Sequence, residues 1–213
     1  MQFLVSRMKY LSAVAAVCAV GVVGVASASA TTTNRQLFEA NGTTVAPNGT
    51  TFSAQSTATA PVTLSNSLVD ISCTMTVPGT VTDNGSTSGS PSANVSPSFS
   101  GCTSNLGPAT VTTYNEPWVL NMPLTGNPGT VSGVSVSIVL DGLITCDYDE
   151  TAAYNVIGDW TNGTPSNVVL SGNLAYSGGD GTFLCGNTGA IHGTVDVDTT
   201  STPGNNLLIL PAP

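Results

Sequence analysis

The sequence has 213 residues and carries few charges, with 3 Lys and Arg against 12 Asp and Glu and a formal net charge of −9. Nucleic-acid binding requires basic side chains that neutralise phosphates, so this composition excludes a nucleic-acid partner and disfavours anionic membrane surfaces. A surface with so few charges has to be built from Thr, Ser, Asn and Gly.

Residues 1–30 have the pattern of a secretory signal peptide. Arg7 and Lys9 precede an apolar run over residues 11–25, and Ala28-Ser29-Ala30 fits the small-x-small cleavage site. The run is shorter than the roughly 20 residues that span a bilayer, which argues against an anchor helix.

The remaining chain, residues 31–213, suits one domain with its own core. Cleavage would leave Arg35 as its only base. No later apolar run is long enough to span a membrane. These features predict a secreted protein, either extracellular or loosely associated with the cell wall.

Four cysteines follow the expected signal peptide, and Cys18 lies inside it. An even number in an exported chain predicts two disulfides. Three connectivities are possible, and we favour the sequential pairs Cys73–Cys102 and Cys146–Cys185 because they join neighbouring strands. A zinc site is the alternative, but the sequence has no C-x-x-C motif and a single histidine.

Apolar residues recur at every second position, which is the period of a strand with one buried face. The pattern is clearest over 69–77, where Val69, Ile71, Met75 and Val77 alternate with polar residues. In chain order, we expect strands or strand-like segments over 36–40, 52–55, 62–64, 69–77, 95–99, 111–114, 117–122, 134–148, 154–160, 168–176, 183–185, 191–197 and 207–210.

Three of these expectations are specific enough to test. Pro78-Gly79 is expected to end the strand over 69–77 in a turn or bulge. The run 134–148 is expected to be one long strand, bent or bulged at Asp141-Gly142, because its apolar residues keep the same parity throughout. Phe183 and Cys185 are expected to share one face of a strand.

No segment shows apolar residues at helical spacing, and the abundance of Gly, Pro, Thr and Val disfavours helix. Many short strands separated by turns predict an all-β fold. We expect a single-domain antiparallel β-sandwich or barrel stapled by two disulfides.

Several short motifs follow one another in an order that resembles a group of small exported actinobacterial proteins of uncharacterised function. The resemblance covers most of the chain after residue 30, and its motifs are structural, so it implies no catalytic residue. The motifs are Ser72-Cys73-Thr74, Phe99-Ser100-Gly101-Cys102-Thr103, Pro117-Trp118-Val119-Leu120, Cys146, Trp160-Thr161-Asn162-Gly163-Thr164 and Cys185.

Acidic residues cluster at the end of the expected strand over 134–148. Asp147, Asp149 and Glu150 could supply oxygen ligands to calcium, although the run lacks the EF-hand pattern. The competing interpretation is a solvated acidic strand end. Paired carboxylates could also serve glycoside hydrolysis, but the chain has few aromatic residues to line a sugar cleft.

His192 is the only histidine, so a Ser-His-Asp hydrolase would have to use it, with Asp196 on the same side of the strand. No G-x-S-x-G motif is present, and an exposed strand histidine is the competing interpretation. Nucleophilic catalysis by cysteine is excluded if all four remaining cysteines are paired.

These observations favour a non-catalytic protein, secreted or in the cell envelope, that acts by binding or as a structural surface component without a cofactor. The expected partner is a glycan, a cell-wall component or another copy of the chain. A calcium-dependent or glycan-binding module is the first alternative, and a hydrolase that uses His192 is the second.

Overall fold

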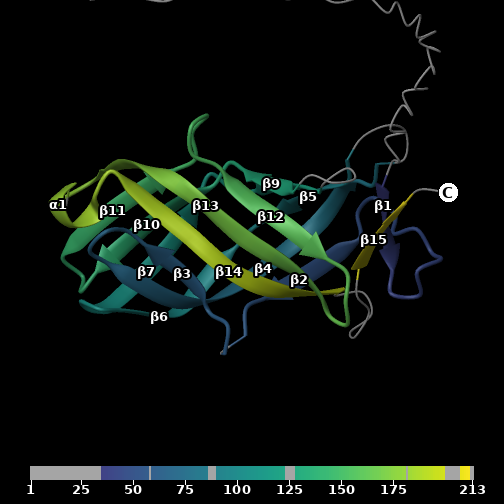
Figure 1. Ribbon diagram of the computed structural model, residues 1–213, viewed down its shortest axis with the longest axis horizontal. Helices are drawn as coiled ribbons and strands as arrows, with labels where there is room; N and C mark the ends of the chain where they lie inside the picture. The colour runs from purple at the N-terminus through teal and green to yellow at the C-terminus, as the bar shows by residue number, and fades with distance from the viewer. Residues whose placement is uncertain are drawn as a thin grey trace, which may run out of the picture. The chain divides into compact units, whose positions relative to one another are not determined.

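The computed structural model describes residues 35–57, 59–85, 90–122, 128–180, 182–199 and 207–211, and the expected signal peptide lies outside these ranges. Contacts within the chain separate residues 1–31 from 32–213, and all the described residues belong to the second unit. The elements (Figure 1) are β1 (Arg35–Glu39), β2 (Thr51–Gln55), β3 (Val62–Ser65), β4 (Asp70–Asp83), β5 (Ser92–Val95), β6 (Ser98–Ser104), β7 (Gly107–Tyr114), β8 (Trp118–Asn121), β9 (Gly129–Ser132), β10 (Ser135–Leu140), β11 (Ile144–Asp149), β12 (Val156–Thr161), β13 (Ser166–Gly179), α1 (Thr182–Cys185), β14 (Thr188–Thr199) and β15 (Leu207–Pro211).

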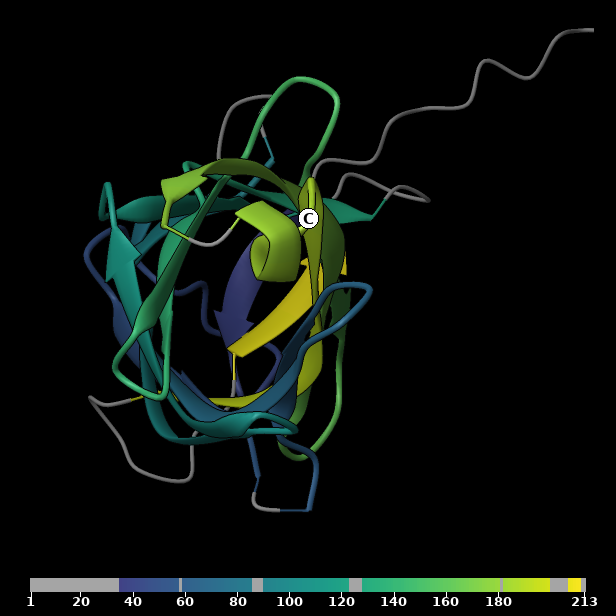
Figure 2. The ribbon, with the colours of Figure 1, turned by 90° about the vertical axis from the view of Figure 1, so that its left-hand side faces the viewer.

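The described strands form a two-stranded sheet, β1 with β15, and a 13-stranded antiparallel sheet that closes on itself. Five consecutive pairs, β2/β3, β5/β6, β7/β8, β9/β10 and β11/β12, each behave as one interrupted strand, because both members bond to the same neighbouring segments. With the uninterrupted β4, β13 and β14, they make a closed barrel of eight described segments (Figure 2). Each segment pairs with the next along the chain, and β14 pairs back with β2/β3, which is the up-and-down arrangement.

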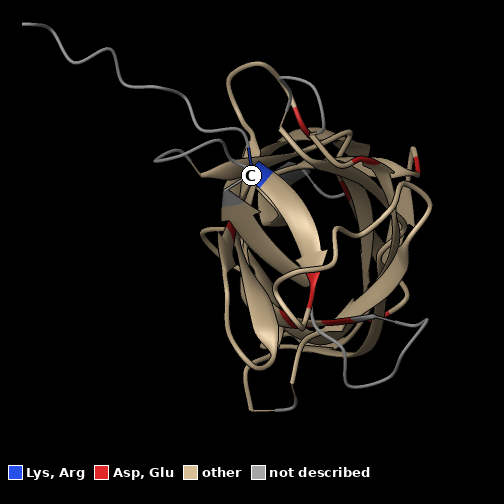
Figure 3. Ribbon diagram, turned by 90° about the vertical axis from the view of Figure 1, so that its right-hand side faces the viewer, with Lys and Arg blue, Asp and Glu red and all other residues tan. Residues whose placement is uncertain are grey.

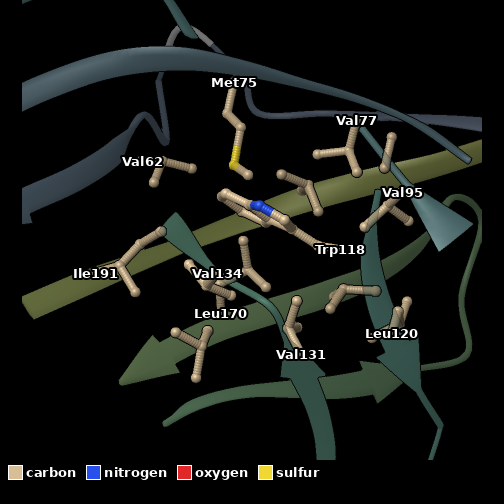
Figure 4. Packing of buried hydrophobic residues seen from close by; sticks show 14 of the residues in the cluster. Val62, Met75, Val77, Val95, Trp118, Leu120, Val131, Val134, Leu170 and Ile191 are labelled. Atoms are coloured by element: carbon tan, nitrogen blue, oxygen red, sulfur yellow. The ribbon is translucent and has the colours of Figure 1, made fainter. Parts of the chain in front are cut away.

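This architecture confirms the predicted all-β antiparallel fold, in its barrel form. Alternation places one face of each strand inside. In β4, Ile71, Cys73 and Met75 are buried, whereas the residues between them point outward. Trp118 is the largest fully buried side chain, and Figure 4 shows it in the centre of the core beside Met75. The interior is therefore a packed apolar core.

The expected end of the strand at Pro78-Gly79 is wrong, because β4 continues to Asp83. Pro78 accepts a hydrogen bond from the Ser96 N–H at 3.0 Å, so its nitrogen faces the interruption between β5 and β6, where no ladder bond is lost. At Gly79 a Cβ atom would lie 2.3 Å from the ring of Phe52, so the missing side chain makes room for this aromatic residue.

The expected single strand over 134–148 is also wrong, because it is the hairpin of β10 and β11. Asp141 and Gly142 both adopt positive φ angles in the turn, at 48° and 68°. Leu140 pairs with Ile144 and Ile138 with Cys146. A turn with an odd number of residues keeps the parity of the buried positions, so alternation alone cannot distinguish this hairpin from a bent strand.

Two further expectations need correction. Phe183 and Cys185 lie in the one-turn helix α1 rather than in a strand, with Phe183 exposed and Cys185 buried. Two apolar residues two positions apart are too short a pattern to decide between the two structures. Tyr154 precedes β12 and is not part of that strand. Within the described ranges, no helix is long and apolar enough to cross a membrane.

Both predicted disulfides are confirmed. Cys73 of β4 pairs with Cys102 of β6, at a point where the register of these two strands shifts. Cys146 of β11 pairs with Cys185 and so ties α1 to the barrel wall. The first disulfide joins two paired strands, and the second joins a strand to the helix at the barrel end. Both are the sequential pairs that we expected.

Three asparagines fasten the elements that close the two ends of the barrel. At the end seen in Figure 3, the Asn84 amide bonds to both backbone groups of Leu37 in β1. The Asn162 amide bonds in the same way to both backbone groups of Ile209 in β15. At the opposite end, Asn66 donates to the carbonyls of Leu184 and Cys185 in α1, at 3.0 and 2.9 Å.

Candidate functional site

The barrel interior leaves little room for a ligand. Two apolar cavities have volumes of only about 20 and 30 Å³, the second one beside Trp118 and Met75. A volume of about 10–15 Å³ on this measure holds one water molecule. Each of these two cavities is therefore too small for a ligand much larger than a few water molecules.

An open depression of about 550 Å³ lies on the wall near the middle of the barrel, and we call it the waist groove. It forms where three neighbouring segments are interrupted, between β7 and β8, between β9 and β10, and between β11 and β12. Its lining is mostly polar and consists of Asn115, Gly133, Val134, Ser135, Asp149, Glu150, Thr151 and Ala152.

The first interruption is fixed from inside the barrel. The buried indole of Trp118 donates a hydrogen bond to the carbonyl of Tyr114 at 3.1 Å. Asn115 has a φ of 55°, a conformation that asparagine tolerates better than most residues. Its side chain donates to the Ser135 hydroxyl at 3.0 Å, so the groove is lined by a buried hydroxyl whose position is set.

The second interruption is held by Glu150. One of its carboxylate oxygens accepts hydrogen bonds from the N–H groups of Gly133 and Val134, at 2.5 and 3.4 Å. Its own N–H donates to the Val134 carbonyl at 2.8 Å. A carboxylate therefore replaces the strand pairing that is missing between β9 and β10.

The structure divides the three carboxylates that the sequence grouped together. Asp149 and Glu150 line the waist groove. Asp147 lies one pleat away and accepts hydrogen bonds from the Ser137 and Tyr114 hydroxyls, at 2.6 and 3.1 Å. Within the described residues, no three His, Cys, Asp or Glu side chains are grouped as a metal site would require.

The surroundings of Tyr114, which donates a hydrogen bond to Asp147, raise the pKa of its phenol. Burial, with the charge of Asp147 and its hydrogen bond, raises the pKa of Tyr114 to about 12, and the charge of Asp149 acts in the same direction. The pKa of Tyr148, inside the barrel, is raised by burial. Tyr114 therefore keeps its proton to a higher pH than an ordinary tyrosine does.

His192 lies on a different part of the wall. It is exposed on β14, opposite Ser171 of β13 and Thr63 of β3. Asp196 is on the same face, but four residues of strand separate the two by about 13 Å at roughly 3.3 Å per residue. The distance is too long for the hydrogen bond between imidazole and carboxylate that a hydrolase would need.

Sequence reasoning missed Asn115, Ser135 and Thr151, because the groove depends on interruptions in three segments at one level. Two signals were present in the sequence. Glu116-Pro117 follows the strand over 111–114, and Gly133 separates two apolar positions, Val131 and Val134, that differ in parity. A change of parity within an apolar run indicates a break in a strand.

No protein-family model matches the chain, and neither a curated protein nor a solved structure shows detectable similarity to it.

Proposed function

We propose that this chain is a non-catalytic binding protein that works outside the cytoplasm and takes a neutral glycan in the waist groove. The observation that carries the proposal is the groove itself, an open polar depression of about 550 Å³ on the wall of a barrel whose interior is filled. The two disulfides support an oxidising compartment as the place of action.

The lining chemistry favours a neutral ligand rich in hydroxyl groups. Carboxylate oxygens of Asp149 and Glu150 accept hydrogen bonds from hydroxyls, and the side chain of Asn115 can both donate and accept. Arg35, in β1, is the one Lys or Arg in the described ranges, so phosphate, sulfate and carboxylate groups would meet only negative charge in the groove. Among sugars, this selects uncharged ones.

Two tyrosines at the ends of the interrupted strands add apolar surface. Tyr114 directly precedes Asn115, and Tyr154 forms a β-bridge with Thr151 of the lining. Each is 37% exposed and lies next to a lining residue without being part of the lining, so a ligand that extends past the groove could reach its ring. Aromatic rings offer apolar faces to sugar rings, and this contact leaves the hydrogen bond from the Tyr114 hydroxyl to Asp147 in place.

The non-catalytic part of the proposal is supported by the roles that the polar groups already have. Glu150 holds the backbone of the neighbouring interruption, and Asp147 binds two hydroxyls. His192 lies on another part of the wall. A general acid or base must lie within hydrogen-bond reach of its substrate. Glu150 and Asp147 instead form hydrogen bonds within the protein.

A glycan array followed by titration calorimetry on the best neutral hit tests the proposal. We expect Asp149→Ala and Thr151→Ala each to weaken binding at least tenfold, because both remove a hydrogen-bonding group from the lining. Asp159→Ala, an exposed carboxylate on β12 outside the lining, is the matched control and should change affinity less than twofold.

Three results would replace the proposal. An array without any neutral glycan hit would remove it. Equal losses in Asp159→Ala and Asp149→Ala would show a charge effect without a site. Binding that disappears with a chelator and returns with calcium would favour the calcium-dependent alternative.

A further inference from the structure

The end of the barrel that carries α1 exposes large apolar side chains on all four of its connections. These connections join β3 to β4, β6 to β7, β10 to β11 and β13 to β14, and the antiparallel order places them at the same end. We define the apolar rim as Leu68, Leu106, Leu143 and Phe183, one from each connection, exposed by 44%, 48%, 78% and 83%.

The four connections are bonded to one another in sequence around the end. The Asn105 side chain, beside Leu106, donates to the Leu68 carbonyl at 3.0 Å and accepts from the Asp70 N–H at 3.0 Å. The Asp141 N–H, near Leu143, donates to the Pro108 carbonyl at 2.8 Å. These bonds hold three of the rim residues on a fixed backbone.

The fourth connection is tied on both sides. The Asp180 N–H donates to the Thr145 carbonyl at 3.0 Å, and the Cys146–Cys185 disulfide also joins this connection to β11. Asn66 donates to the Leu184 carbonyl, next to Phe183. Figure 2 shows α1 across this end of the barrel. A fixed backbone beneath exposed apolar side chains lowers the entropy that binding has to overcome.

Charge around the rim limits what can cover it. Asp70, Asp141 and Asp180 are exposed in the same connections or directly beside them, and Arg35, the one Lys or Arg in the described ranges, lies in β1 at the opposite end. Two rims facing each other would bring six carboxylates together, and a lipid surface would bring phosphates against three. A partner that offers both an apolar surface and positive charge would complement the apolar rim and its three aspartates.

We propose that the apolar rim is a docking surface for a protein partner with an apolar hollow surrounded by Lys or Arg. Leu143 and Phe183, the most exposed members, would fill the hollow. The three aspartates would pair with its basic margin. This surface lies at one end of the barrel and is separate from the waist groove.

The test uses a fluorescent amphipathic helical peptide with leucines on one face and lysines on the other, titrated with the protein purified after expression of the full chain. We expect saturable binding that weakens with added salt. A peptide with glutamates in place of the lysines should bind at least tenfold more weakly, because only the sign of its charge differs.

Paired variants locate the binding site. Leu143→Ser with Phe183→Ser should weaken binding of the leucine–lysine peptide at least tenfold, and Val45→Ser, an apolar residue 40% exposed in the connection before β2, should change it less than twofold. Circular dichroism and melting temperature establish that both variants fold. If the double variant does not fold, Asp141→Asn with Asp180→Asn tests the same surface through its charge.

Several outcomes would overturn the proposal. These are equal binding by wild type and the folded rim variant, equal binding of the two peptides, self-association in sedimentation that the rim variant abolishes, and co-sedimentation with phosphatidylcholine vesicles that the rim variant abolishes. The third result would assign the rim to a second copy of the chain, and the fourth to a lipid surface.

Discussion

Single residues on the barrel wall have their chemistry set by the neighbour across the strand. Asp147 shows this, because its carboxylate accepts hydrogen bonds from hydroxyls on two other strands, β7 and β10. The sequence identified Asp147, Asp149 and Glu150 as one acidic cluster, but it could not show that Asp147 binds Tyr114 and Ser137 while the other two line the waist groove. That separation depends on which strands become neighbours.

The raised pKa of Tyr114 leads to a prediction at high pH. Because the folded state holds the phenol proton more tightly than the unfolded state, the contribution of Tyr114 to stability is complete below its ordinary pKa of 10.0 and is lost as pH rises toward about 12. In Asp147→Asn the negative charge and the charged acceptor are removed, so the pKa of Tyr114 should fall while burial keeps it above 10.0.

Ultraviolet titration of tyrosinate in wild type, Asp147→Asn and Tyr114→Phe measures this effect. One phenol that ionises above the ordinary pKa in wild type should shift downward in Asp147→Asn and be missing in Tyr114→Phe. Identical titration curves for wild type and Asp147→Asn would contradict the contact between these two side chains.

The positions of individual strands were predicted better than the points where they end or join. Alternation located β4 and β14 because one face of each is buried. It could not separate β10 from β11, because their turn preserves parity, and it could not show that Pro78 faces an interruption on the neighbouring segment. Both errors concern the relation between segments, which periodicity within one segment does not contain.

The attachment of β1 to the barrel leads to a prediction for Asn84. Its buried side chain bonds to both backbone groups of Leu37 and to the carbonyl of Ala46. Removing the side chain leaves the Leu37 N–H and the Ala46 carbonyl without hydrogen-bond partners, whereas the Leu37 carbonyl keeps the Ala46 N–H. Each buried group without a partner lowers the stability of the fold by about 1–3 kcal/mol. Asn84→Ala should therefore lower the free energy of unfolding by about 2 kcal/mol or more in urea titrations.

Asn94→Ala is the matched control, because it removes the same side chain at a partly exposed position on β5. It should lower the free energy of unfolding by less than about 1 kcal/mol, as surface substitutions usually do. Similar losses in both variants would show that the Asn84 side chain has no special role in holding β1.

At the largest scale, the described strands of the 13-stranded sheet form a barrel in which three continuous strands maintain the pairing across five interruptions. The sequence predicted an antiparallel sandwich or barrel but could not choose, because closure depends on β14 pairing with both β13 and β2/β3. The waist groove could not be predicted from the sequence for the same reason, because it forms only when three interrupted segments lie side by side.

Crosslinks contribute to stability at this scale. The disulfides close chain separations of 29 and 39 residues, and the chain-entropy model gives about 3–4 kcal/mol for loops of this length. Cys73→Ala with Cys102→Ala, and Cys146→Ala with Cys185→Ala, should each lower the free energy of unfolding by about that amount.

Only the second pair of variants should also expose residues 180–187 to limited proteolysis, because it releases α1 from the barrel end. Urea titration and mass spectrometry of the fragments measure the two effects. Equal proteolysis of this segment in both variants would contradict the role of Cys146–Cys185 in fastening α1.

The interruption between β11 and β12 already lets residues 151–154 leave the sheet and return to it while β13 bonds to both strands. A foreign peptide grafted there would add length outside the hydrogen-bonded ladder, so the barrel should display it without refolding. For the same reason, this loop can vary in sequence and length beside the waist groove while the two ends of the barrel stay unchanged.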